Sequence, residues 1–397
     1  MNRRHFIKTS GLISTAMMLP RFLKAEERNT PLNTDKVLVV IQLTGGNDGL
    51  NTVVPFENDI YYQARPTVAI PKSNVLKLDS QLGLHPEMKG FMELYQEGNM
   101  ALINNVGYPE PDRSHFRSMD IWHTASSSKE YLSTGWIGRY LDEQCSKGDM
   151  PTRALEIDDT LSLAMKGDNV KGLALKNPGR LYSTTLNPLI AQLAKQPVTG
   201  DHHHDNAAYL YKTLSETVSS AEYIYQTSKI YHSAATYPNH AFGKSMKTVA
   251  ELITSGVNTR IYYVSLGSFD THFNQQKRQG VLLQQLSETV KIFLDDLKQI
   301  GVADRVMLMT FSEFGRRVQE NASMGTDHGT ASQLFIFGNN LKKKGVVNEA
   351  PDLSNLEEGD LKYTVDFRNI YATILRKWLQ ADEQKILGAK FSYMDFI

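Results

Sequence analysis

Gly267-Ser-Phe-Asp270-Thr-His272 opens a segment in which three polar motifs stand at the ends of apolar runs. The second motif is Val306-Met-Leu-Met-Thr-Phe-Ser312-Glu313-Phe-Gly-Arg316, and the third is Gly325-Thr-Asp327-His328-Gly-Thr-Ala-Ser-Gln-Leu-Phe-Ile-Phe-Gly338. Such apolar runs predict strands that are buried on both faces of a parallel sheet. Polar side chains at the ends of these strands meet at one edge, where α/β proteins bind ligands. The segment therefore predicts an α/β fold with a metal site of the hydrolytic kind.

The spacing within the motifs suggests which residues bind the ion. Asp270 and His272 are two residues apart, so on an extended segment their side chains emerge on the same side, as two ligands of one ion require. Asp327 and His328 are neighbours and would face opposite ways, so we expect His328 to bind and Asp327 to support a ligand. A lone histidine is more often structural, but four candidate ligands, two histidines and two aspartates, at the ends of successive strands favour a metal site.

The rest of the chain supplies further strands and helices. Apolar runs predict strands at residues 37–43, 100–104, 260–266, 305–310 and 334–337. Amphipathic patterns predict helices at residues 207–233, 241–255, 275–299 and 366–379. Residues 126–258 begin with an irregular stretch and end with two of these helices. This pattern predicts an insertion within a single domain that spans residues 29–397.

Composition limits the possible partners. The 397-residue chain is 41% hydrophobic and 22% charged, and its formal net charge is zero, so no global field favours nucleic acid or an acidic membrane surface. Its one cysteine, Cys145, excludes an internal disulfide and a thiolate zinc cluster. A metal must therefore be held by histidines and carboxylates. The run His202-His203-His204 is better explained as a solvated loop, because adjacent side chains point in different directions.

Residues 1–28 are typical of an export signal. Arg3 and Arg4 precede a mildly apolar run at residues 7–19, which resembles a twin-arginine signal with Asn2 in place of the usual Ser or Thr. The run is too short and too interrupted to span a bilayer stably. A basic tail without this role is the alternative. We expect a periplasmic or otherwise exported protein whose partner is the twin-arginine export machinery.

Two loops after predicted strands offer further site residues. The first contains Asn47 and Asp48, whose oxygens could bind a metal, although Asn-Asp-Gly is also an ordinary turn. The second leads through Arg113 and Ser114 into a helix. Backbone N–H groups at a helix start stabilise anions, so Ser114 is either a nucleophile beside a charged arginine clamp or a simple helix cap.

These motifs resemble the DUF1501 family, a group of bacterial proteins of unknown function that are often exported. The resemblance rests on the paired arginines and on Gly45-Gly-Asn-Asp-Gly-Leu-Asn-Thr-Val-Val-Pro55, Arg113-Ser-His-Phe116, Asp270-Thr-His272, Glu313-Phe-Gly-Arg316 and Thr326-Asp-His-Gly329. That family is similar in turn to the alkaline phosphatase and sulfatase superfamily. This similarity implies a three-layer α/β/α sandwich with a mostly parallel central sheet.

The superfamily's pattern also implies roles for single residues. Asp270, His272 and His328 would hold one zinc. A second metal would use Asp48 or Asn47, Glu313 and the nucleophile Ser114, but Phe314 stands where the superfamily has a ligand. Arg113 or Arg316 would neutralise the transferred group, and His115, like Asp327, would support the ligands. The Cys/Ser-x-Pro-x-Arg motif of formylglycine sulfatases is missing from the sequence.

We therefore expect a hydrolase of phosphate or sulfate esters, carried by small molecules or glycans, with one or two divalent ions, zinc first and Mg²⁺, Mn²⁺ or Ca²⁺ as alternatives. A catalytically silent binding or assembly protein is the rival hypothesis, and Phe314 favours it. A carbohydrate-directed esterase or lyase rests only on the abundance of Tyr and Trp.

Overall fold

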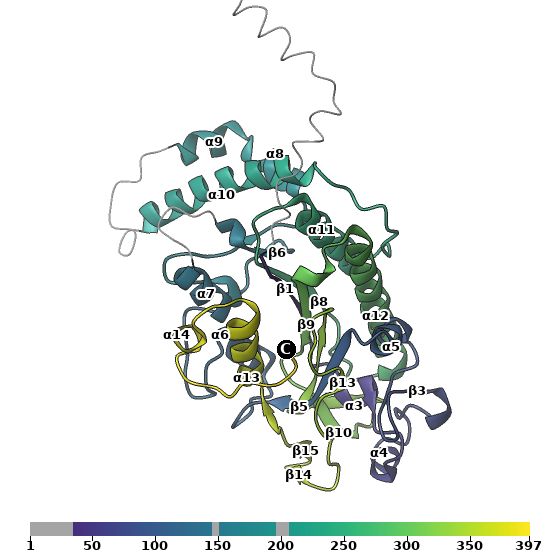
Figure 1. Cartoon of the computed structure of the whole chain (residues 1–397). Helices are drawn as coiled ribbons and strands as arrows, with labels where there is room; N and C mark the ends of the chain where they lie inside the picture. The colour runs from purple at the N-terminus through teal and green to yellow at the C-terminus, as the bar shows by residue number, and fades with distance from the viewer. Residues whose placement is uncertain (1–34, 145–150, 196–205) are drawn as a thin grey trace, which may run out of the picture. The chain divides into compact units, whose positions relative to one another are not determined.

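A nine-stranded sheet forms the centre of the structure, a computed structural model that describes residues 35–144, 151–195 and 206–397 (Figure 1). Residues 1–28, for which the sequence predicts an export signal, lie outside the described residues, as do Cys145 and His202–His204. The strand order is β13-β5-β12-β9-β1-β8-β6-β7, and β16 also pairs with β5. These strands are β1 (Val37–Leu43), β5 (Met100–Gly107), β6 (Ala154–Glu156), β7 (Leu173–Ala174), β8 (Ile261–Leu266), β9 (Val306–Phe311), β12 (Ser332–Phe337), β13 (Gly345–Val346) and β16 (Val365–Asp366).

Strand direction brings the polar motifs to one edge of the sheet. β1 lies between β8 and β9 and is parallel to both, whereas β12 is antiparallel to β9 and β5. The carboxyl ends of the three central parallel strands therefore point the same way, and β12 begins where they end. The loops that follow Leu43, Leu266 and Phe311 consequently lie next to one another.

Helices cover both faces of the sheet, which confirms the predicted three-layer α/β/α arrangement. Val37, Val39 and Ile41 pack in one core cluster with α5 (Lys89–Gln96), α11 (Ala241–Ser255) and α12 (Gln275–Ile300). Leu38 and Val40 pack in a second cluster with α6 (His115–Thr124), α7 (Trp136–Gln144), α13 (Phe367–Thr373) and the π-helical turn Ile374–Trp378. Successive strand residues face opposite sides, so a continuous apolar run serves two cores. Burying each such side chain contributes about 1.5–3 kcal/mol.

The predicted elements agree closely with the observed ones in the sheet and less closely at helix ends. The helix expected at residues 207–233 is α10 (Asn206–Ser228), and the one expected at residues 366–379 continues from α13 as the π-helical turn. The segment at residues 126–258 contributes β6 and β7 to the sheet edge, together with α7, α8 (Pro178–Thr185), α9 (Pro188–Ala194), α10 and α11.

Smaller elements surround the edge that carries the motifs. They are α3 (Gly49–Thr52), α4 (Asp59–Ala64), the sheet of β2 (Val53–Val54), β3 (Leu76–Lys77) and β4 (Gly83–Leu84), the pair β10 (Arg316–Glu320) and β11 (Thr326–His328), and the hairpin β14 (Leu356–Glu357) and β15 (Asp360–Leu361). The last helix, α14 (Glu383–Leu387), packs on α7 and α13. Short 3-10 turns occur at Lys72–Asn74, Pro151–Arg153, Leu163–Met165 and Ala303–Arg305.

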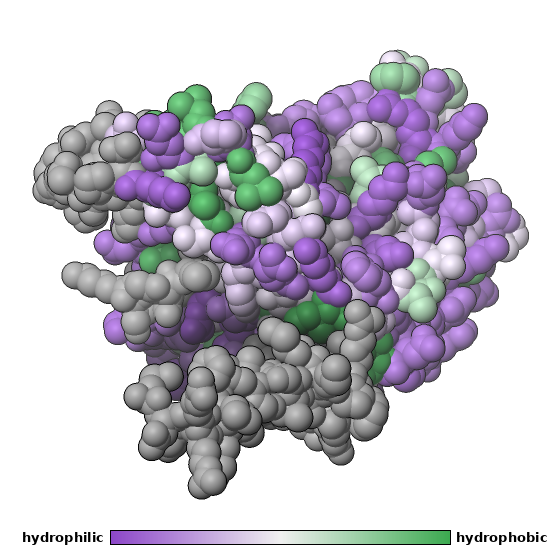
Figure 2. Space-filling model, turned by 90° about the horizontal axis from the view of Figure 1, so that it is seen from above, coloured by the Kyte–Doolittle hydropathy of each residue, from purple (hydrophilic) through white to green (hydrophobic). Residues whose placement is uncertain are grey.

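The outer surface is mixed in character. Hydrophilic residues cover most of the face seen in Figure 2, and hydrophobic ones are scattered between them. Among the described helices, none combines the length and the apolar character that a membrane crossing requires.

Candidate metal centre

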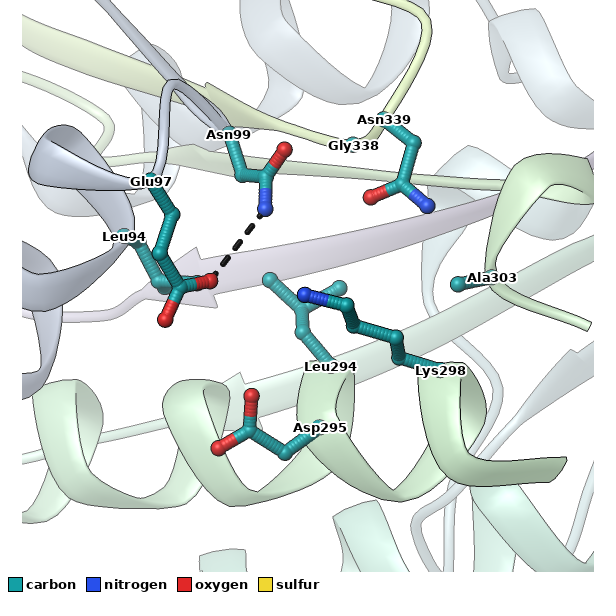
Figure 3. Close-up of a pocket in the computed structure, with 9 residues that line it drawn as sticks. All are labelled: Leu94, Glu97, Asn99, Leu294, Asp295, Lys298, Ala303, Gly338 and Asn339. Atoms are coloured by element: carbon teal, nitrogen blue, oxygen red, sulfur yellow. Dashed lines mark hydrogen bonds between the residues drawn. The ribbon is translucent and has the colours of Figure 1, made fainter. Parts of the chain in front are cut away.

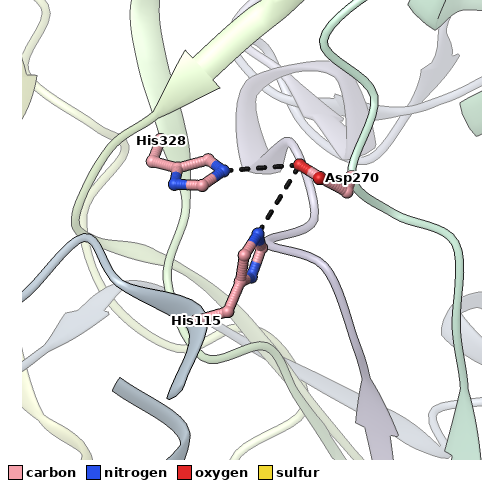
Figure 4. A group of neighbouring side chains, drawn as sticks. All are labelled: His115, Asp270 and His328. Carbon is pink, nitrogen blue, oxygen red and sulfur yellow. Dashed lines mark hydrogen bonds and ion pairs between the residues drawn. The ribbon is translucent and has the colours of Figure 1, made fainter. Parts of the chain in front are cut away.

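Three histidines and one aspartate meet at the carboxyl edge of the sheet. Asp270 and His272 lie in the loop after β8, His328 ends β11, and His115 begins α6. In Figure 4 the rings of His115 and His328 point toward the carboxylate of Asp270 from two different elements. The four residues come from three parts of the chain that the strand order brings together.

One carboxylate oxygen is the centre of this cluster. Asp270 Oδ1 lies 3.0 Å from His272 Nε2, 3.3 Å from His328 Nε2 and 3.6 Å from His115 Nε2. The Nε2 atoms of His272 and His328 are themselves 3.0 Å apart. The ligand-type atoms of His115, Asp270 and His328 all lie within 4.8 Å of one another.

Each histidine is oriented by an acceptor at its other ring nitrogen. His115 Nδ1 lies 2.8 Å from Glu313 Oε1 and His272 Nδ1 lies 3.1 Å from Asp327 Oδ1. His328 Nδ1 lies 2.8 Å from the carbonyl oxygen of Arg113. A carbonyl or carboxylate oxygen only accepts hydrogen bonds, so each Nδ1 carries a hydrogen and each ring turns its Nε2 toward the cluster, where that nitrogen can bind an ion when it is unprotonated.

The donor set fits a divalent ion. Two Nε2 lone pairs at 3.0 Å repel one another unless a proton or a cation lies between them. Histidines that bind metals characteristically donate their second ring N–H to a carboxylate or a backbone carbonyl, as all three do here. Imidazole nitrogens with one carboxylate oxygen form a set that suits zinc and related divalent ions.

Arg316 holds the carboxylate of Asp270 in place. Its side chain is fully buried and donates to Asp270 Oδ1 at 2.6 Å. The same guanidinium donates to the backbone carbonyls of Gly45, Gly46, Phe269 and Thr326. Partial burial raises the pKa of Asp270, but the hydrogen bond and charge of Arg316 outweigh it, so this pKa lies below its usual value. The donors of Arg316 thus bind groups of the protein itself and are not directed toward a bound anion.

The histidines differ in their affinity for protons. The hydrogen bond from His115 to Glu313 holds the pKa of His115 above its usual value, against the opposing effect of partial burial. Burial lowers the pKa of His328, and the positive charges of Arg316 and His115 add to this effect. His328 is therefore neutral near pH 7, as a metal ligand must be. The Asn321 amide and His272 lower the pKa of Asp327.

The structure places Glu313 and His115 differently from the sequence prediction, in which Glu313 binds the metal and His115 supports it. Glu313 is fully buried, and its Oε1 accepts from Gly45 N and lies beside His115 Nδ1, each at 2.8 Å. It therefore lies behind His115, whose Nε2 faces the cluster. Little in the sequence indicates that His115 faces the cluster. It follows Ser114 at a helix start, and only the direction of its side chain, which the sequence does not show, sets it apart from its neighbours.

The side chains of Asn47 and Asp48 make hydrogen bonds and an ion pair away from the histidine cluster. Asp48 caps α3 by accepting from Leu50 N at 3.1 Å, and its other oxygen pairs with Arg65 at 2.6 Å in a fully buried ion pair. The Asn47 amide donates to Thr52 Oγ1 at 2.8 Å. Gln275 of α12 also donates to Asp48 Oδ2, and Gln279 of the same helix donates to Asn47 Oδ1 at 3.1 Å. The contacts of both side chains are thus with α3, Arg65 and the first turns of α12.

Ser114 and Arg113 lie at the start of α6. Ser114 occupies the N-cap position, but its exposed side chain makes no capping hydrogen bond. The Arg113 guanidinium pairs with Asp360 and, at 3.3 Å, with Glu358, so it points toward the β14–β15 hairpin. Arg117 donates to the carbonyl oxygens of three residues in the following loop.

Phe314 forms an apolar wall of the cluster. Its ring is only 2% exposed and its centroid lies 4.9 Å from that of His115 and 4.7 Å from that of His328. A ring in this place supports the two imidazoles and offers no ligand atom.

A separate hollow lies at the opposite edge of the sheet (Figure 3). Its enclosed volume is only about 10 Å³, and it is lined by Leu94, Glu97, Asn99, Leu294, Asp295, Lys298, Ala303, Gly338 and Asn339. Asn99 precedes β5 and Ala303 precedes β9, so these residues mark the amino ends of parallel strands. The hollow shares no residue with the cluster.

Solved structures with a similar fold come from several bacteria. They include the PsFucS1 sulfatase from Pseudoalteromonas sp. (10% identity, 94% of this chain and 72% of that chain, TM-score 0.37). A second is the C-terminal periplasmic domain of EcEptC from Escherichia coli (10% identity, 90% of this chain and 87% of that chain, TM-score 0.37). A third is a protein in the alkaline phosphatase superfamily from Vibrio parahaemolyticus (8% identity, 89% of this chain and 69% of that chain, TM-score 0.35).

A search of curated proteins finds no match to this chain. A family model does match, and it extends over residues 35–390. This range contains every strand and helix that forms the cluster. The chain therefore belongs to DUF1501, a family described as proteins of unknown function.

Proposed function

We propose that the protein is an exported hydrolase of phosphate or sulfate esters that binds one divalent metal ion through His115, Asp270, His272 and His328. The observation that carries this proposal is the fixed orientation of three histidines. Each donates from Nδ1 to an acceptor and presents Nε2 to the same carboxylate oxygen. Proteins build this pattern to bind metal ions.

Each group of the site has a task in such a reaction. A bound divalent ion supplies Lewis acidity that polarises the ester. Arg316 keeps Asp270 ionised and in position. The start of α6 faces the site with His115, and its N–H groups and dipole favour a bound anion. Ser114 is exposed at that helix start and its hydroxyl makes no capping hydrogen bond, so it is the nucleophile in this proposal. Its oxygen would form a bond to phosphorus or sulfur while the bond to the alcohol of the ester breaks, and that alcohol leaves with a proton. Water would then hydrolyse the seryl ester, which releases phosphate or sulfate and restores the serine hydroxyl.

Residues 1–28 support the exported location in this proposal. The paired arginines before a short apolar run are typical of a signal read by the twin-arginine machinery. That machinery moves folded proteins, which suits a protein loaded with metal. The substrate would be an ester of a small molecule or a glycan.

Metal content is the first test. The full chain, Asp270→Ala/His328→Ala and the control His232→Ala would be purified and their metal measured by mass spectrometry. His232 has a side chain that is 74% exposed and pairs only weakly with Glu251. We expect one tightly bound ion per chain in the wild type and the control, and loss of that ion in the double variant. Metal-free wild-type protein, or a double variant that keeps its ion, would overturn the proposed site.

Turnover is the second test. Aryl phosphate and aryl sulfate esters would be assayed with Zn²⁺, Mg²⁺, Mn²⁺ or Ca²⁺ in the wild type and in Ser114→Ala. We expect Ser114→Ala to keep its metal and to lose turnover by about 100-fold or more. Unchanged turnover would remove Ser114 as the nucleophile but would leave the metal site standing.

A catalytically silent binding or assembly protein is the second candidate. The buried ring of Phe314 lies against His115 and His328, and Asp48 is committed to Arg65. Both observations argue against a second metal at this site. A metal-loaded wild type that hydrolyses none of the esters would favour this candidate.

A further inference from the structure

Arg113 links a ligand histidine to a distant hairpin. Its carbonyl oxygen lies 2.8 Å from His328 Nδ1. Its guanidinium donates to Asp360 Oδ2 from Nε at 2.9 Å and from Nη2 at 2.5 Å. The backbone of one residue therefore orients His328 while its side chain is anchored 247 residues further along the chain.

Asp360 is a buried anchor that pairs with two arginines. Its side chain is 1% exposed, and its second oxygen accepts from Arg317 Nε at 3.2 Å. Asp360 begins β15, directly after a two-residue turn in which Glu358 and Gly359 both have positive φ, of 52° and 85°. Such turns match the twist of the paired strands and fix their geometry.

The hairpin also holds the chain just beyond the ligand. Thr330 Oγ1 donates to the carbonyl oxygen of Leu361 at 2.6 Å, two residues after His328. The hairpin is thus linked to His328 in two ways. Asp360 holds Arg113, whose carbonyl oxygen lies beside Nδ1 of the ring, and Leu361 holds Thr330, two residues after His328 in the chain. Arg113 lies between β5 and α6, and its side chain is 40% exposed. The peptide that carries its carbonyl is also held by a hydrogen bond from Ser114 N to Asp112 Oδ1 at 2.7 Å, so the salt bridge to Asp360 is the long-range restraint on this peptide.

We propose that Asp360 is a positioning residue of the metal centre, which acts through Arg113 to hold the carbonyl group that orients His328. This inference rests on the metal binding in the proposed function. It also gives Arg113 a structural task in place of an anion clamp. Groups that orient metal ligands typically change metal affinity by about 10- to 100-fold when they are removed.

Glu358 provides a matched control on the same turn. It carries the same charge and lies 3.3 Å from Arg113 Nη2, but its side chain is 76% exposed. An exposed ion pair contributes little, so Glu358→Gln tests the loss of one negative charge near Arg113 without loss of the anchor.

The experiment measures the affinity for Zn²⁺ by competition with a chromophoric chelator, in the full chain. We expect Asp360→Asn to weaken binding by about 10-fold or more, and Glu358→Gln to change it by less than about 2-fold. Asp360→Glu should restore part of the loss. In a His328→Ala background, Asp360→Asn should cause no further loss, because its effect passes through that histidine. Urea unfolding of the metal-free proteins separates this effect from a loss of folding.

Arg113→Lys covers the case in which Asp360→Asn does not fold. It keeps the backbone carbonyl and the charge but loses the paired donors, so we expect a weaker ion affinity with near-normal stability. Wild-type affinity in both variants, or an equal loss in the His328→Ala background, would overturn the inference and leave the proposed function intact. If the wild type itself binds no ion, the proposed function fails and the inference fails with it, so the two failures differ in the wild-type measurement.

Discussion

Arg316 connects the loop after β1, the loop after β8 and the β10–β11 pair through a single side chain. It is fully buried and donates to four backbone carbonyls as well as to Asp270. A buried charge is costly unless its partners are all present, and removing one member of such a set leaves the others unsatisfied. The guanidinium therefore belongs to the fold as much as to the site.

Arg316→Ala should lower the free energy of unfolding by about 3–5 kcal/mol, because it leaves four carbonyls and a carboxylate without their donor. Arg316→Lys should recover only part of this loss, since an ammonium group has fewer donors. Urea unfolding measures both. Arg180→Ala, on an exposed position of α8, is the control, and we expect a change below about 0.5 kcal/mol there. Equal effects at the two positions would contradict this account of Arg316.

Glu156 makes stability depend on pH. Burial raises its pKa from 4.5 to about 7. Between these values the unfolded chain loses the proton while the folded chain keeps it, so the unfolding free energy falls as pH rises, by about 3 kcal/mol in all, and levels off above about pH 7. Glu156→Gln should remove this fall and still accept from Ser162 N.

Urea unfolding of Glu156→Gln and wild type at pH 5 and pH 8 tests this sign. The variant should gain stability relative to the wild type at pH 8 and little at pH 5. Glu349→Gln, at an exposed position, should follow the wild type at both values. A variant that is less stable than the wild type at pH 8 would show that the charged carboxylate is favoured in the fold.

Single residues also show where sequence reasoning reaches its limit. Asp270 and His272 can be found from their spacing after an apolar run, because strand ends and short spacings are local features. The exchange between His115 and Glu313 cannot, because it depends on which way two side chains point from α6 and from the end of β9. Asp48 fits a ligand and a helix cap equally well until Arg65, 17 residues later, is known to reach it.

At the level of elements, the loop after β1 lies very close to the loop after β8. Gly45 has φ of +118°, and a Cβ atom there would lie 2.4 Å from the backbone nitrogen of Asp270. Only glycine combines this backbone conformation with this distance. The contact fixes the loop after β1 against the loop that carries Asp270 and His272.

Gly45→Ala should destabilise the protein by more than about 2 kcal/mol, because it adds backbone strain and a collision with Asp270. It should also weaken metal binding, since Asp270 must move. Gly256 is the matched control: its φ is +82°, yet nothing lies within 4 Å of its Cβ position. Gly256→Ala should therefore cost only the strain, about 1–2 kcal/mol, and leave metal affinity unchanged. Thermal unfolding and chelator competition check both.

Elements with a continuous apolar run were the most predictable. Val37–Leu43 was predicted at its exact bounds because both of its faces are buried, so every residue carries the signal. The π-helical turn at Ile374–Trp378 was not predicted, because its apolar pattern fits an α-helix as well, and only packing against the sheet distinguishes the two.

At the level of the whole molecule, the cluster joins parts of the chain that are far apart. His115 and His328 are separated by more than 200 positions, and the loop after β8 lies between them in sequence. The sequence predicts that the loops after these strands lie together, because strands in a parallel sheet end at a common edge, but it gives His115 only a supporting role. The order of the strands, including the antiparallel β12, depends on long-range packing that no local pattern records.

An ion that binds only the folded chain should stabilise the whole unit. At a free Zn²⁺ concentration of about 100 times the dissociation constant, the unfolding free energy should rise by about 2.7 kcal/mol. Chelation with EDTA should reverse the gain. Urea unfolding with and without the ion measures it. The Asp270→Ala/His328→Ala variant should show no gain, and an equal gain in that variant would place the ion elsewhere.

The three residues 113–115 give the centre both a ring and the acceptor for another ring. His115 contributes its own imidazole, and the Arg113 carbonyl, two residues earlier, orients His328. A displacement of this one turn would disturb two of the four groups together. Transplanting the centre into a designed scaffold would therefore require that the turn, β11 and the β14–β15 hairpin be moved as one block, because four side chains grafted alone would arrive without the framework that aims them.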